Sequence, residues 1–79
     1  MTAAYVLVKA ELGMQNDAVT KIRKIKGVES AHTVTGPYDL IVFVEGESLE
    51  ELGKTVISRI QNLKVIKDTM TCIVLEPTI

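Results

Sequence analysis

The sequence predicts an α+β fold, with a four-stranded antiparallel sheet and two helices on one face, in the order strand, helix, strand, strand, helix, strand. Three observations support this prediction. Two segments carry apolar residues at helical spacing, four strand-like runs flank them, and the two halves of the chain overlay when Ile22 is placed on Ile57. Two βαβ halves with right-handed crossovers, joined by a hairpin, form the split arrangement called ferredoxin-like.

The first half begins with a strand-like run from Ala4 to Ala10. We expect Asn16 or Asp17 to cap the first helix, and Gly27 to end it in the left-handed conformation. The second strand is expected from Val28 to Thr35. The apolar positions of the helix recur at intervals of three and four, which is one helix face: Ala18, Val19, Ile22 and Ile25.

The second half repeats this order after a Gly-Pro turn. The third strand is expected from Leu40 to Glu45, and Ser48 with Glu51 fits a capping box that opens the second helix. Asn62 is expected to end this helix, and Ile66 to Glu76 to form the last strand before Pro77. The apolar stripe of the second helix is predicted at Leu49, Leu52, Val56, Ile57 and Ile60.

The two central strands are apolar on both faces. The first strand has Val6 and Val8 on one face and Tyr5 and Leu7 on the other, and the run from Leu40 to Val44 is apolar throughout. Two helices cover only one face of such a sheet, so the second face would be a large exposed apolar patch. We therefore expect a homodimer that packs sheet against sheet.

Composition and charge exclude several classes of function. With a net charge of −1, no tryptophan and a single phenylalanine, the chain is a poor candidate for direct nucleic-acid binding. Cys72 has no second cysteine, and His32 is the single histidine, so we expect no disulfide, metal site, cofactor or catalytic residue. No signal peptide or membrane span is recognised, so one cytoplasmic domain over residues 1–79 is expected.

One turn carries more polarity than its geometry requires. In the segment Thr35-Gly36-Pro37-Tyr38-Asp39-Leu40, glycine and proline suit a turn, whereas Asp39 at the mouth of the next strand is not needed for it. Asp39 could hold an ammonium group while loop amides near Gly36 hold a carboxylate, or it could bond to its own turn. Thr69 and Thr71 share one face of the last strand, and their hydroxyls could bind a polar ligand or be ordinary strand residues.

Three segments together resemble one family. Gly27-Val28, the run from Thr35 to Leu40, and the ending from Asp68 to Glu76 are similar to the effector-binding RAM domain of the Lrp/AsnC (feast/famine) transcription regulators. The resemblance covers about Ala4 to Glu76. Family members usually carry a helix-turn-helix domain ahead of this one, so the chain resembles a stand-alone version.

The resemblance implies a function and a site. It implies a dimeric α/β-barrel type of sandwich whose dimers assemble further, including rings of dimers, and which binds an amino acid effector between dimers. It also implies full-length Lrp/AsnC regulators as partners. The ligand-binding residues implied are Thr35, Gly36, Pro37, Tyr38, Asp39, Leu40, Thr69 and Thr71. Pro37 departs from the acidic or polar residue usual after the glycine, and it has no N–H to donate.

Two alternatives remain open at this point. Small ferredoxin-like dimers include monooxygenases and isomerases, for which His32 would be the candidate base in a polar interior. ACT-type regulatory domains share the strand order and usually bind amino acids through the loop after the first strand, here near Gly13. Nucleic-acid binding through the same fold is a distant fourth.

Overall fold

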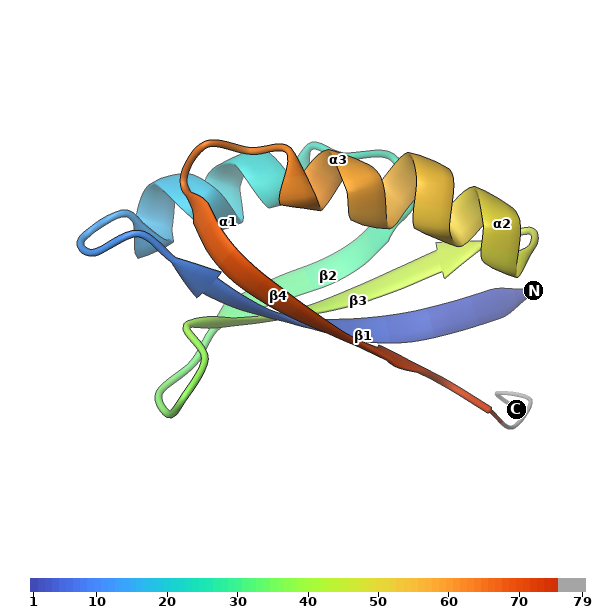
Figure 1. Ribbon diagram of the computed structural model, residues 1–79, viewed down its shortest axis with the longest axis horizontal. Helices are drawn as coiled ribbons and strands as arrows, with labels where there is room; N and C mark the ends of the chain where they lie inside the picture. The colour runs from blue at the N-terminus through green and yellow to red at the C-terminus, as the bar shows by residue number, and fades with distance from the viewer. Residues whose placement is uncertain (76–79) are drawn as a thin grey trace.

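The computed structural model describes residues 1–75, which form one four-stranded antiparallel sheet with all helical segments on one side (Figure 1). The strands are β1 (Thr2–Ala10), β2 (Val28–Thr33), β3 (Leu40–Gly46) and β4 (Ile66–Ile73), in the spatial order β2-β3-β1-β4. Two βαβ units with this order give the ferredoxin-like fold. The predicted fold class is therefore confirmed, while Glu76 and Pro77 lie outside the described residues.

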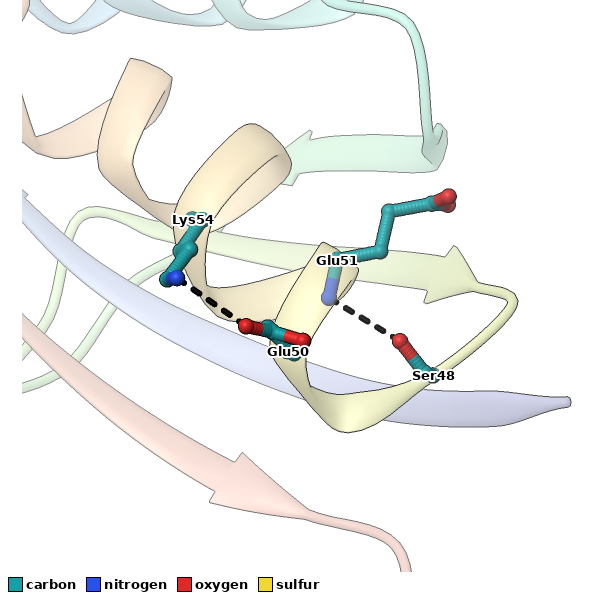
Figure 2. Close-up of polar contacts among 4 residues, drawn as sticks. All are labelled: Ser48, Glu50, Glu51 and Lys54. Carbon is teal, nitrogen blue, oxygen red and sulfur yellow. Dashed lines mark hydrogen bonds and ion pairs between the residues drawn. The ribbon is translucent and has the colours of Figure 1, made fainter.

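The second helix is one continuous run of three segments in which the helix type changes. The segments are α2 (Leu49–Glu51), the π-helical stretch η1 (Leu52–Ile57) and α3 (Ser58–Gln61). Figure 2 shows the start of this run, where Ser48 Oγ accepts a hydrogen bond of 3.1 Å from the Glu51 amide. The Glu51 carboxylate in turn accepts from the Glu47 amide at 3.2 Å. The predicted Ser48 cap is therefore confirmed, while Glu51 reaches back to an amide one residue earlier than the capping box predicts.

The apolar stripe of this helix differs from the prediction at its first position. Leu52, Val56 and Ile60 are buried, but Leu49 is 59% exposed. A π-helical turn holds one residue more than an α-helical turn, which rotates the residues before it by about 100° relative to those after it. The stretch η1 therefore turns Leu49 away from the face that Val56 and Ile60 share.

The first helix, α1 (Gln15–Arg23), begins without a side-chain cap. Met14 occupies the N-cap position, so the prediction of Asn16 or Asp17 as the cap was wrong. Because Asp17 lies inside the first turn, its carboxylate pairs with Lys21 one turn later at 3.1 Å. At the other end, the Arg23 guanidinium donates two hydrogen bonds, of 3.1 and 2.7 Å, to the carbonyl oxygen of Ala31 in the edge strand β2.

Gly27 allows the closest approach between the sheet and the second helix. Its φ of +100° lies in the left-handed region, and a Cβ built there would lie 2.4 Å from Val56 Cγ2. Its carbonyl accepts a hydrogen bond from the Glu45 amide. The predicted left-handed conformation of Gly27 is confirmed, but Gly27 does not end the helix, because α1 ends at Arg23 with Lys24 as its C-cap. A Cβ at Gly27 would require Val56 to move.

The face of the sheet under the helices forms the core, and the opposite face, here called the open face, is not covered by any described element. Buried residues of β1 and β3 alternate with outward ones, so Val6, Val8, Leu40, Val42 and Val44 face the helices. The open face carries Tyr5, Leu7, Ile41, Phe43, Met70 and Cys72. Tyr5 is 47% and Met70 49% exposed, and the Tyr5 and Phe43 rings lie 4.9 Å apart.

The open face has charged residues at its two ends. Lys9 lies at the end of β1 opposite Asp68, and Glu45 lies at the other end, opposite Ala3. The expected sheet with two apolar faces is present, and charged residues lie at both ends of its exposed face.

No helix in the described part of the chain is long and apolar enough to cross a membrane.

Candidate functional site

Asp39 fastens the loop between β2 and β3 to the end of β1. Its carbonyl accepts a hydrogen bond from the Val34 amide and its amide donates to the Val8 carbonyl, both at 2.8 Å. Its Oδ2 accepts from the Ala10 amide at 2.9 Å, beside the point where the β1–β4 register shifts. Asp39 therefore bonds to a neighbouring strand and not merely to its own turn.

The tip of this loop is open to solvent. Thr35, Gly36 and Pro37 are exposed, while Leu40 is fully buried in the core. Gly36 has a φ of +134°, a conformation that favours glycine, and nothing lies within 4 Å of the position of a Cβ there. The amides of Gly36 and Tyr38 remain available as donors, whereas Pro37 has none.

Tyr38 reaches from the loop onto the open face. Its hydroxyl donates to Met70 Sδ in β4 at 3.8 Å, and the Lys9 ammonium lies 5.4 Å from the centre of its ring. In Figure 1 the loop hangs below the sheet, on the side away from the helices. The side chains of Tyr38 from the loop, Lys9 from β1 and Met70 from β4 therefore lie together on the open face.

Thr69 and Thr71 lie on the helix side of β4. They pair in register with Val8 and Val6, whose side chains point into the core. The Thr69 hydroxyl accepts a hydrogen bond of 3.0 Å from Gln61 Nε2 at the end of α3. Because β4 is an edge strand, both threonines lie at a free side of the sheet, half-buried.

Within one chain, the Tyr38 side chain and the two threonines lie on different sides of the sheet. Leu40 and Thr69 flank Val8 at the same level, so their Cα atoms are about 10 Å apart across two strand spacings. Two surface pockets lie elsewhere. One, of about 480 Å³, is lined in part by Gly27 and Glu45, and the other, of about 300 Å³, in part by Arg23 and His32. The predicted site residues thus form two separate surfaces, and their assignment to one ligand stays a prediction.

Residues that would support other chemistry are dispersed. Among residues 1–75, no group of His, Cys, Asp and Glu side chains could hold a metal ion. Cys72 is exposed on the open face, and His32 is exposed on β2 opposite Ile41. In the same part of the chain, the buried residues include no polar or charged one.

The family model described as the Lrp/AsnC ligand binding domain matches residues 3–79. The chain belongs to this family. This Lrp/AsnC domain is 33% identical over 75 residues to an uncharacterized HTH-type transcriptional regulator of Pyrococcus furiosus, PF0250, covering 91% of this chain and 50% of that protein. It is also 34% identical over 74 residues to a homocitrate synthase of Sulfurisphaera tokodaii, covering 92% of this chain and 16% of the enzyme.

Solved structures share the fold of this Lrp/AsnC domain along nearly its whole length. The crystal structure of FFRP-DM1 superposes with a TM-score of 0.89 at 31% identity, covering 95% of this chain and 100% of that one. A Neisseria meningitidis regulator solved as an L-Met complex, NMB0573, has a TM-score of 0.83 at 18% identity, covering 95% and 50%. The chain spans about half the length of the regulators it matches.

The residues that the loop contacts were not predicted from the sequence. Tyr38 and Asp39 were predicted as ligand-binding residues, but their partners Ala10, Lys9 and Met70 were not. One signal was available, since Lys9 is the one charged residue in the otherwise apolar first strand. The Ala10 amide carries no side-chain signature, because its contact depends on how β1 and β3 align.

Proposed function

We propose that this domain binds a small amino acid and couples its binding to the assembly of chains, and that it acts as a regulatory module and not as an enzyme. The matching family is described as ligand binding, and the same domain occurs within a transcription regulator and within a synthase. Two proteins with such different activities have in common a need for control by a small molecule. A portable sensing domain satisfies that need.

The chemistry of the loop supports an amino acid as the ligand. Asp39 Oδ2 accepts the Ala10 amide, and no hydrogen bond from residues 1–75 reaches Oδ1, which can accept from an ammonium group. The amides of Gly36, which is exposed, and Tyr38, which is partly buried, can donate to a carboxylate. The Neisseria regulator that contains a domain of this fold was solved as a complex with an amino acid, L-Met.

The separation of the two surfaces supports a site shared between chains. Tyr38 lies on the open face and Thr69 on the helix side of β4, so within one chain the two do not face a common space. The loop tip and the edge strand both lie at the surface, so the loop of one chain can meet the threonines of a neighbour. Assembly beyond the dimer then completes the site, and the ligand stabilises that assembly by mass action.

The open face supports a second copy as the primary partner. Its centre is apolar and partly exposed, with Tyr5 and Met70 about half accessible. Lys9, with Asp68 beside it, and Glu45 lie at opposite ends of this face, so two copies packed with their strands reversed place Lys9 of one near Glu45 of the other. The face is therefore complementary to itself in apolar character, with a Lys9–Glu45 pair between copies at each end.

A thermal-melting screen against the twenty amino acids, with solution mass measured in parallel, tests this function. A ligand at a hundred times its dissociation constant raises the free energy of unfolding by about 2.7 kcal/mol. For a domain of this size that corresponds to a rise in Tm of roughly 10–20 °C. If no amino acid at millimolar concentration raises the Tm or changes the mass, the sensing function is wrong, while the fold stands.

A further inference from the structure

We propose that Tyr38 is a positioning residue that couples the order of the ligand loop to dimer formation. The proposal rests on the proposed function, because it takes the open face as the dimer contact and the loop as one wall of the ligand site. It adds a physical link between the two. That link is made by the Tyr38 side chain, which belongs to the loop but lies on the open face.

The loop is held at one end and open at its tip. Asp39 fixes the end through Val8, Ala10 and Val34, and these bonds lie within the sheet. Thr35 to Pro37 are exposed. The Tyr38 side chain is the contact by which the loop reaches β4, two strands away from β3. The position of the tip therefore depends on whether Tyr38 stays on the open face.

In a single chain this contact is weak. Met70 is 49% exposed, and the hydroxyl-to-sulfur distance of 3.8 Å is typical of a weak hydrogen bond. The Lys9 ammonium above the Tyr38 ring is attracted to the face of the ring, and such contacts strengthen when water is excluded. A second copy that covers the open face removes water from Met70 and the ring together.

The consequence is reciprocal. A dimer that strengthens the Tyr38 contact also orders the loop tip, and a ligand that orders the loop tip favours the dimer by the same factor. The ring supplies most of this coupling, because the sulfur is a weak acceptor while the ring carries both the packing and the cation contact.

Hydrogen exchange of the loop amides, read as a function of protein concentration, tests the proposal. Sedimentation equilibrium first gives the dimer dissociation constant, and exchange of Gly36 and Tyr38 is then measured below and above it. We expect exchange to slow by about five- to tenfold in the dimer, the change expected when a cation–π contact is desolvated. Equal exchange in the monomer and the dimer overturns the proposal.

Two variants separate the ring from the hydroxyl. Tyr38→Phe should keep the slowing in the dimer, whereas Tyr38→Ala should abolish it and weaken the dimer several-fold. Tyr5→Phe is the matched control, because it removes a hydroxyl from the same face without touching the loop. If the dimer is too tight for its dissociation constant to be measured, the comparison is made in the dimer alone. Equal protection of the loop amides in the wild type, Tyr38→Phe and Tyr38→Ala then overturns the proposal.

The outcomes also distinguish this inference from the proposed function. If exchange of the loop amides in the dimer is the same with and without the Tyr38 ring, the coupling is refuted and the proposed function is unaffected. Coupling observed in a dimer that binds no amino acid refutes the sensing function and leaves the coupling standing. A chain that is monomeric at every concentration refutes both the dimer and the coupling.

Discussion

The Asp39 carboxylate has one observed hydrogen bond and one proposed contact, and two substitutions separate them. The observed contact is the hydrogen bond from the Ala10 amide to Oδ2, and the proposed one is to the ammonium group of a ligand. Asp39→Asn keeps an oxygen that can accept the Ala10 amide but removes the charge. Asp39→Ala removes both.

The structure sets the size of each effect. A hydrogen bond to a charged acceptor contributes about 1.5–3 kcal/mol, and a neutral one about 0.5–1.5 kcal/mol. Because Asp39 is half-buried, the lower part of each range applies. We expect Asp39→Ala to lower the free energy of unfolding by about 2 kcal/mol and Asp39→Asn by about 1 kcal/mol. These changes correspond to drops in Tm of roughly 8–16 °C and 4–8 °C.

Ligand affinity should follow a different order. Both variants lack the negative charge, so both should bind the amino acid at least about tenfold more weakly, which corresponds to the loss of one charge-assisted hydrogen bond. Denaturant unfolding at one fixed protein concentration measures stability, and titration calorimetry measures affinity. The alanine and asparagine variants should therefore differ in stability and agree in affinity.

Two results would contradict this reasoning. If Asp39→Ala is as stable as the wild type, the Ala10 bond does not hold the loop. If Asp39→Asn binds the amino acid with unchanged affinity, Asp39 does not contact the ammonium group, and its role is structural.

Three further predictions concern packing, capping and assembly. Gly27→Ala should destabilise the protein by about 1–3 kcal/mol more than Gly13→Ala in unfolding experiments, because both glycines have positive φ but only Gly27 has atoms where the Cβ would lie; equal losses would refute the close approach. Ser48→Ala should cost about 1 kcal/mol of unfolding free energy through loss of the helix cap, and a neutral result would contradict it. Lys9→Glu or Glu45→Lys alone should weaken the dimer in sedimentation equilibrium, and the double variant should recover the part due to the charge pair but not the part due to the Lys9–Tyr38 contact; no recovery would exclude the reversed packing.

Much of the fold could be predicted from patterns that are local in sequence. The spacing of Ala18, Val19 and Ile22 predicted the buried face of α1, and the Ser48 cap was visible from its partner Glu51 three residues later. The exposed position of Leu49 was not predictable, because the π-helical stretch that rotates it has no signature in the residue types.

The candidate site could be predicted less completely than the fold. The loop from Thr35 to Leu40 was recognisable as unusually polar, but its contacts with Ala10, Lys9 and Met70 depend on strand register and on the face to which each residue points. Thr69 and Thr71 were correctly predicted to share a face. That this face is the opposite one from the Tyr38 contact requires the assembled sheet.

The pairing of Arg23 with the Ala31 carbonyl has a consequence for how far assembly can proceed. Edge strands offer unpaired backbone groups to other chains, and the guanidinium occupies one of these groups on β2. A strand added from another chain at this edge would have to displace the guanidinium to pair with that carbonyl. The contact therefore works against open-ended growth by strand addition at β2.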